Sequence, residues 1–181
     1  ESGNSVRSLD FNEKEKVFVE EFQMLTSKPV LYVCNVDEAS AKKGNKYVDL
    51  VKENVKCENA EVIILAVATE SDIAELEDYD EQQIFLEDIG LEEPGAARLI
   101  RAAYSLLNLQ TYFTVGVKEV RAWTVFVGAT APQAAGEIHT DFEKGFIRAE
   151  VMQYDTFVEF GSEAKVKEAG KLGVEGKEYI V

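Results

Sequence analysis

A short polar motif, Asn35-Val36-Asp37-Glu38, carries the most informative chemistry in the sequence. The Asn35 amide offers both a donor and an acceptor, the pattern that pairs with N6 and N7 of adenine. Guanine instead needs a carboxylate that accepts from its N1–H and N2 amino groups. Glu38 is one methylene longer than the aspartate that usually does this. The motif therefore favours an adenine-binding turn, and a plain polar turn is the alternative.

Self-contained catalytic motifs are missing from the sequence. It has no His-Glu-x-x-His, no Cys-x-x-Cys, no Gly-x-Ser-x-Gly and no Gly-x-x-x-x-Gly-Lys-Ser/Thr phosphate-binding loop. We therefore predict no catalytic residue and no metal site, and the chain alone is expected to be inactive as a triphosphatase. The single histidine, His139, is interpreted as a loop or capping residue. The acidic run 75–81 is interpreted as a solvated face.

Two apolar runs, 29–34 and 61–67, are expected to be the strands that position the polar motif. Apolar residues at helical spacing predict a helix over about 45–56 between them. This strand–helix–strand order calls for a right-handed crossover and a parallel sheet. Ligands of such sheets bind beyond the carboxyl ends of the strands, here residues 35–38 and 67–70.

The remaining elements divide the chain near residue 109. Before that point we predict helices over 12–26 and 94–107 and an acidic, helically spaced segment over 71–90 with Gly90 as its C-cap. After it we predict a hairpin (111–117 and 121–127), a short helix from Thr130, a strand over 145–151 and a short helix near 154–160. That order is typical of a β-grasp, ubiquitin-like domain. The expected fold class is thus α/β followed by α+β.

Composition limits the partners. The 181 residues carry a net charge of −15, of which residues 102–181 contribute only −3. This disfavours a protein whose whole surface binds DNA, RNA or an anionic membrane, and places any polyanion contact in the second half. Two cysteines without a disulfide framework, and no apolar stretch of about 20 residues, indicate a reduced, cytosolic compartment and no membrane span.

Several stretches make the chain resemble the YchF/Obg-like ATPase family, a branch of the Obg-related P-loop GTPases. They are NLQTYFT at 108–114, GVKEVRAWT at 116–124, GATAPQAAG at 128–136, IHTDFEKGFIRA at 138–149 and KPVLY at 28–32, together with the Asn-x-x-Glu motif. The resemblance implies a parent with a P-loop nucleotide domain, an inserted coiled-coil arm and a C-terminal TGS domain. Residues 1–26 would end the arm, 27–108 would complete the P-loop NTPase sheet domain, and 109–181 would be the TGS domain without its last strand.

The resemblance also implies a function. The parent would be a ribosome-associated switch protein that binds and hydrolyses ATP with Mg²⁺. The residues that hold the phosphates and Mg²⁺ would lie outside this chain. By motif match, the adenine-nucleotide residues would be Asn35, Val36, Glu38, Val67, Ala68 and Thr69, the last three as a second base-contacting loop. Ribosome or RNA contacts through the TGS domain would use Lys118, Arg121, Lys144 and Arg148, with solubilising surface charges as the alternative. A non-enzymatic TGS module that binds RNA, the ribosome or a protein is the alternative function.

Overall fold

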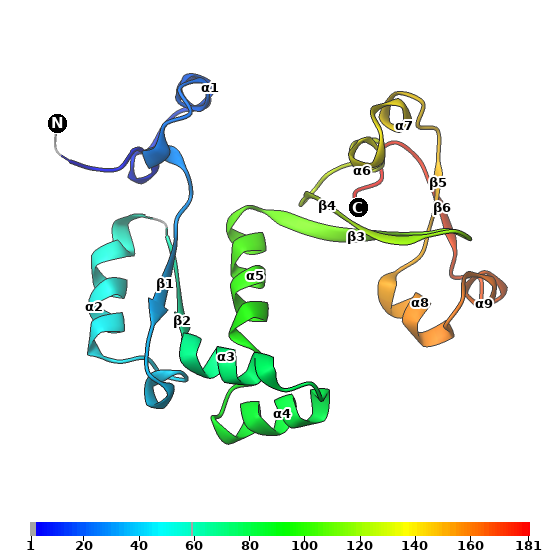
Figure 1. The fold of residues 1–181 in the computed structure, drawn as a ribbon. Helices are drawn as coiled ribbons and strands as arrows, with labels where there is room; N and C mark the ends of the chain where they lie inside the picture. Colours follow the sequence, from blue (N-terminus) through cyan, green and yellow to red (C-terminus); the bar gives the residue numbers. More distant parts are fainter. Residues whose placement is uncertain (1–2, 59) are drawn as a thin grey trace. The chain divides into compact units, whose positions relative to one another are not determined.

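The structure, a computed structural model, describes residues 3–58 and 60–181. The chain folds as two compact units, one ending at Leu107 and the other covering Asn108–Val181 (Figure 1). Each unit has its own strands and its own buried residues.

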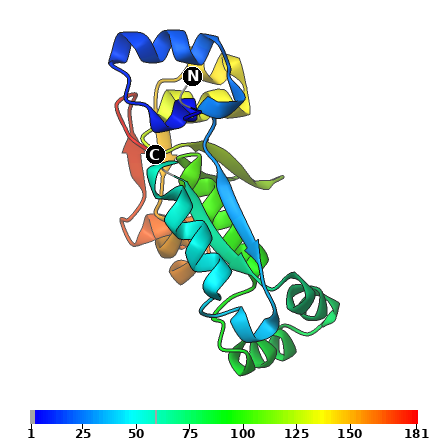
Figure 2. The same cartoon turned by 90° about the vertical axis from the view of Figure 1, so that its left-hand side faces the viewer.

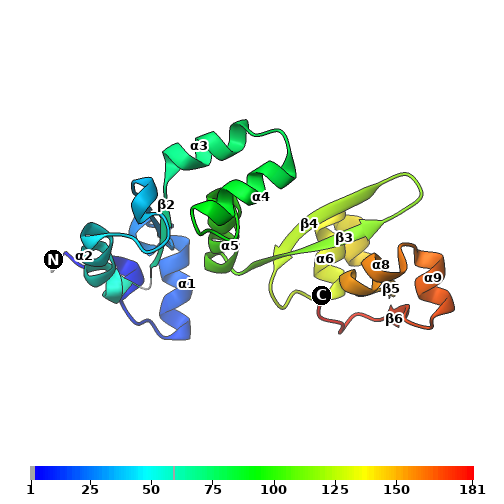
Figure 3. The same cartoon turned by 90° about the horizontal axis from the view of Figure 1, so that it is seen from below.

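A parallel strand pair forms the centre of the first unit. Strand β1 (Leu31–Asn35) pairs with β2 (Glu61–Leu65) so that Asn35 lies opposite Leu65. The crossover between them contains helix α2 (Lys46–Val55), which Asn45 caps. Figures 1 and 3 show the strand pair between α2 and α5 (Gly95–Leu106). The prediction of a parallel pair joined by a helix is therefore confirmed.

Helix α1 (Glu13–Glu21) begins with a capping box formed by Asn12 and Glu15, and it is shorter than expected. The prediction of a helix over 12–26 was wrong beyond Glu21, because Gln23 adopts a left-handed φ of 47° that ends the helical path. A 3₁₀ turn, η2 (Leu25–Ser27), follows. Phe22 and Leu25, which lie in the part of the predicted helix that does not form, are both largely exposed.

The acidic segment predicted over 71–90 is two helices, α3 (Val67–Glu75) and α4 (Tyr79–Asp88). They separate because Leu76 is extended and the Asp78 side chain caps α4. Gly90 ends α4 as predicted: its φ is 74°, and the N–H of Leu91 donates to the carbonyl of Leu86 at 2.8 Å. Figure 2 shows α3 and α4 beyond the carboxyl end of the strand pair.

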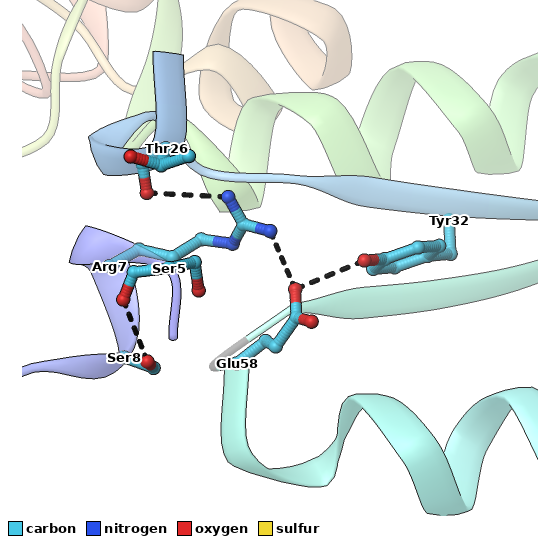
Figure 4. A network of polar contacts seen from close by, with 6 residues as sticks. All are labelled: Ser5, Arg7, Ser8, Thr26, Tyr32 and Glu58. Carbon is cyan, nitrogen blue, oxygen red and sulfur yellow. Dashed lines mark hydrogen bonds and ion pairs between the residues drawn. The ribbon is translucent and has the colours of Figure 1, made fainter. Parts of the chain in front are cut away.

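A polar network holds the N-terminal segment at the opposite end of the strands (Figure 4). Arg7, in the 3₁₀ turn η1 (Val6–Ser8), donates to Glu58 at 2.6 Å and to the carbonyl of Thr26 at 3.3 Å. The Tyr32 hydroxyl donates to the same Glu58 oxygen at 3.0 Å. The hydrogen bond from Arg7, and then the one from Tyr32, lower the pKa of Glu58 below its ordinary value. Sequence reasoning missed this network because its members lie far apart in the chain.

The second unit contains a hairpin and a second strand pair. As predicted, β3 (Leu109–Val115) and β4 (Val120–Phe126) are antiparallel. After the hairpin, residues 127–181 form four helices: α6 (Ala131–Ile138), α7 (Thr140–Lys144), α8 (Tyr154–Phe160) and α9 (Glu163–Glu168). Strand β5 (Ala149–Val151) pairs with β6 (Gly173–Glu175). The strand predicted over 145–151 was too long, because Gly145 ends α7 and pairing with β6 starts only at Ala149.

The core of the second unit lies between the hairpin and α6. Val125, Ala129 and Ala134 are buried there, with Tyr112 packed against them. The Tyr112 hydroxyl donates to the carbonyl of Ala134 at 2.7 Å, which joins β3 to α6. Burial, and then the charge of nearby Glu137, raise the pKa of the Tyr112 hydroxyl above its ordinary value.

Candidate base-binding site

Asn35 is the last residue of β1, and its side chain links the carboxyl ends of the two parallel strands. Its Oδ1 accepts a hydrogen bond from the N–H of Val67 at 3.2 Å. Just beyond, the N–H of Val36 donates to the carbonyl of Leu65 at 2.8 Å, so the strand pairing continues up to the polar motif. The structure thus brings the two strand ends predicted from sequence into contact.

The Asn35 hydrogen bond also fixes the direction of the amide. Because a backbone N–H is the partner, the oxygen of the amide faces Val67 and its Nδ2 faces away. Asn35 itself is exposed. At this site the Asn35 Nδ2 can therefore donate to a ligand, while one lone pair of Oδ1 is taken by the N–H of Val67.

The other residues of the motif have separate tasks. Val36 is half-buried beside the strand ends. Asp37 caps the 3₁₀ turn η3 (Glu38–Ser40), and its Oδ1 accepts from the N–H of Ser40 at 2.9 Å. Glu38 begins that turn and is exposed. Of the two acidic residues, Asp37 shapes the turn, and Glu38 presents its carboxylate to solvent.

The second predicted contact segment, Val67-Ala68-Thr69, is the first turn of helix α3 instead of a loop. The strand predicted over 61–67 ends at Leu65, and Ala66 is the N-cap. Val67 and Ala68 are exposed, whereas Thr69 is 3% exposed with its side chain inside the unit. The first N–H groups of a helix have no acceptor within the helix. The Val67 N–H is bound to Asn35, so the next N–H groups of this turn are the ones that can donate to a ligand.

Helix α3 is held in place by Glu70, a residue that sequence reasoning missed. The N–H of Gly95, at the start of α5, donates to both carboxylate oxygens of Glu70 at 2.7 Å. A Cβ on Gly95 would lie 2.5 Å from Glu70 Oε1 and from Leu65 Cδ2, so a larger residue would displace these two side chains. The sequence signal was the unexplained glycine after Pro94 at a helix start.

The four basic residues predicted to contact a partner fall into two pairs. Lys118 and Arg121 belong to the β3–β4 hairpin, whereas Lys144 ends α7 and Arg148 precedes β5. Figures 1 and 2 show the hairpin turn and α7 as separate parts of this unit. Arg121 lies 4.2 Å from the centre of the Trp123 ring, and 3.7 Å separates it from the carboxylate of Glu119.

Other candidate groups in the described part of the chain serve the fold. His139 caps α7, with its Nδ1 accepting from the N–H of Asp141 at 3.1 Å, which confirms the capping interpretation. Across residues 3–58 and 60–181, no three His, Cys, Asp or Glu side chains are grouped so that they could hold a metal ion. In those same ranges, none of the helices has the length and apolar character needed to cross a membrane.

Comparison with known proteins gives matches to one family. A family model described as "YchF-GTPase_C: Protein of unknown function (DUF933)" matches residues 109–181. Two curated relatives named "Ribosome-binding ATPase YchF" match the whole chain. The one from Pasteurella multocida (strain Pm70) is 54% identical over 181 residues, which are 49% of its length. The one from Bacillus subtilis (strain 168) is 51% identical over 183 residues, 50% of its length.

A solved structure agrees with these relatives. It is described as "Structure of the Schizosaccharomyces pombe YchF GTPase" and superposes with a TM-score of 0.82 at 33% identity. The match covers 98% of this chain and 47% of that one. Its fold is the mixed α/β fold described above, and the chain spans about half the length of the curated relatives it matches. By sequence and by fold, the chain belongs to the YchF family.

Proposed function

We propose that this chain is the base-recognition and partner-binding part of a ribosome-associated, ATP-binding and ATP-hydrolysing protein of the cytoplasm. The single observation that carries the proposal is the hydrogen bond from the N–H of Val67 to Asn35 Oδ1. It assembles two strand ends at the edge where parallel sheets bind their ligands. The names of the curated relatives, which are ribosome-binding ATPases, support the same reading.

In this proposal Asn35 reads the base through its two Nδ2 donors. The N7 atom of adenine is an acceptor at the edge of the base, so one Nδ2 proton can donate to it. The adjacent N6 amino group is a donor and needs an acceptor, for which the exposed Glu38 carboxylate is suited. Val36 and the first turn of α3 would flank the base. The phosphates and Mg²⁺ would be held by other parts of the parent, because this sequence has no phosphate-binding loop.

Nucleotide titration of the 181-residue chain tests this base site. We expect ATP to shift the ¹⁵N-HSQC signals of Val67 and the Asn35 side chain, with binding in the millimolar range because only the base is held. Asn35→Ala should abolish the shift at Val67. Asn54→Ala is the matched control, since Asn54 donates to the carbonyl of Leu50 on α2, away from this edge. Equal shifts with GTP would refute the adenine preference, and equal shifts in both variants would refute the site.

Residues 109–181 would be the TGS domain that docks on a ribosomal or RNA partner. The family match over these residues and the names of the relatives support this assignment. The stacked pair of Arg121 and Trp123 is the feature suited to a nucleic acid, because it joins a cation to an aromatic surface. If only this part functions, the chain is a non-enzymatic binding module.

Salt dependence tests the partner-binding assignment. Binding to ribosomes, followed by co-sedimentation, should weaken steeply between low and physiological salt. Arg121→Gln should weaken it further, whereas Lys177→Gln removes an equal charge from another exposed position of the same unit and should change little. Affinity that does not change with salt, or an equal loss in both variants, would contradict a local RNA-binding patch.

A further inference from the structure

Glu70, the residue that follows Val67-Ala68-Thr69, joins the first turn of α3 to the start of α5. Both of its carboxylate oxygens accept the N–H of Gly95 at 2.7 Å, across 25 positions of the chain. The first N–H groups of a helix have no acceptor inside that helix, so Glu70 supplies the acceptor for Gly95. Its negative charge also lies at the positive end of the α5 dipole. A hydrogen bond and a charge interaction therefore hold Glu70 at this point.

Gly95 lies between Glu70 and the end of β2. It is buried, and the space where its Cβ would be is already filled by the ends of the Glu70 and Leu65 side chains, each 2.5 Å away. Leu65 is the residue of β2 that is paired in register with Asn35. The start of α5 is therefore close both to the strand end beside Asn35 and to the helix that begins at Val67.

The same turn of α3 carries the backbone donors of the candidate base site. The N–H of Val67 donates to Asn35 at 3.2 Å, and the N–H groups of Ala68 and Thr69 come next in the helix. The side chain of Thr69 is 3% exposed, so it packs into the unit and holds one side of the turn. Glu70 is the following residue, and its bond to α5 holds the other side. The direction of these donors therefore depends on the position of Glu70.

We propose that Glu70 is a positioning residue for base recognition: through Gly95 it fixes the orientation of the first turn of α3, whose N–H groups lie beside the base. The inference rests on the proposed base site around Asn35. Donors that are already held in the binding orientation lose less freedom when a ligand binds, so the contact raises the affinity for the nucleotide. The coupling is reciprocal, and a nucleotide bound at this turn also stabilises the hydrogen bond between Glu70 and Gly95.

Titration of variants with ATP tests the proposal on the 181-residue chain, with the ¹⁵N-HSQC signal of Val67 as the readout. Glu70→Ala removes the acceptor and should raise the Kd about fivefold or more, the lower end of typical coupling between sites. Glu70→Gln keeps an acceptor and should stay within about twofold of the wild type. Gly95→Ala keeps the N–H but displaces the Glu70 side chain, and it should also weaken binding. Glu75→Ala, at an exposed position of the same helix, should leave the Kd unchanged.

Two further measurements separate positioning from stability. Val55→Ala removes buried methyl groups from the last turn of α2, so it should lower the unfolding free energy and leave the Kd for ATP unchanged. Amide hydrogen exchange reports the reciprocal effect. Saturating ATP should slow the exchange of the Gly95 N–H in the wild type and have no such effect in Glu70→Ala.

The outcomes distinguish this inference from the base site on which it rests. If Asn35→Ala abolishes ATP binding while Glu70→Ala binds as the wild type does, the inference is wrong and the base site remains. An equal Kd for the alanine and glutamine variants of Glu70, or an equal loss of affinity in Val55→Ala, also overturns it. If Glu70→Ala does not fold, unchanged affinity in Gly95→Ala overturns it instead. If ATP gives no shift at Val67 in the wild type, the base site and this inference fail together.

Discussion

Replacing Glu70 tests how the base-binding edge is held in place. Its carboxylate accepts the N–H of Gly95 with both oxygens at 2.7 Å, and Gly95 is buried. Hydrogen bonds to charged groups contribute about 1.5–3 kcal/mol, and part of that is the cost of leaving a buried N–H without a partner. Because Glu70 is only half-buried, we expect Glu70→Ala to lower the unfolding free energy of the first unit by about 2 kcal/mol.

The matched variant is Glu70→Gln. It keeps an acceptor for Gly95 and removes the negative charge at the start of α5, an effect of about 0.3–1 kcal/mol. Urea unfolding followed by far-UV circular dichroism measures the loss of helix. The single tryptophan, Trp123, lies in the second unit, so its fluorescence provides an internal control in the same sample.

Three results would refute this reasoning. One is a loss below about 0.5 kcal/mol for Glu70→Ala, which is the range of ordinary surface substitutions. Another is an equal loss for the alanine and glutamine variants, because the acceptor would then not matter. The third is a Trp123 transition that moves with the helix signal, because the change would then not be confined to the first unit.

Three further predictions concern stability. The hydrogen bond from Arg7 lowers the pKa of Glu58. The contribution of ionised Glu58 to folding stability is therefore present above the ordinary pKa of 4.5, and it is lost as the pH falls through the lowered pKa. Thermal melts from about pH 7 to 3 should therefore fall more steeply for the wild type than for Glu58→Gln. Leu86→Ala, at a fully buried site, should cost about 2–5 kcal/mol in urea unfolding, whereas Ile84→Ala on the exposed face of α4 should cost no more than about 0.5. Gly90→Ala should cost about 1–2 kcal/mol by the same assay because its φ is 74°, and Gly90→Asn should cost less, because asparagine tolerates this conformation.

Local patterns in the sequence were sufficient for most elements. The two continuous apolar runs predicted a parallel strand pair. Local sequence also located the start of α1, near residue 12, and the end of α4, at Gly90. The hairpin was predicted over 111–117 and 121–127, and the structure forms it. These features depend on neighbours in sequence, which is why they could be predicted.

Several of the errors arose where contacts distant in sequence decide the outcome. Nothing local to Val67-Ala68-Thr69 indicates that these residues open a helix whose first N–H is bound by Asn35. Strands of three residues, such as β5 and β6, are defined by pairing with each other across 22 or more positions and have too few residues to show a period. The Glu70–Gly95 bond spans 25 positions and leaves only a glycine as its signal.

At the candidate site, the sequence predicted which two strand ends meet. Both strand ends were identified, and the structure brings them together through Asn35 and Val67. The direction of the Asn35 amide could not be predicted. The partner of its oxygen is the N–H of Val67, which begins the helix after β2 and is 32 positions away in sequence. The four basic residues were grouped by residue type alone, and the structure separates them into two pairs.

An intermolecular NOE between Asn35 and bound adenosine nucleotide tests the central claim most directly. The H8 proton of adenine is beside N7, whereas H2 is on the other side of the ring. If Nδ2 of Asn35 donates to N7, its protons should give an NOE to H8 and none to H2. An NOE to H2, or no NOE to Asn35 while the nucleotide is bound, would contradict base recognition by this residue.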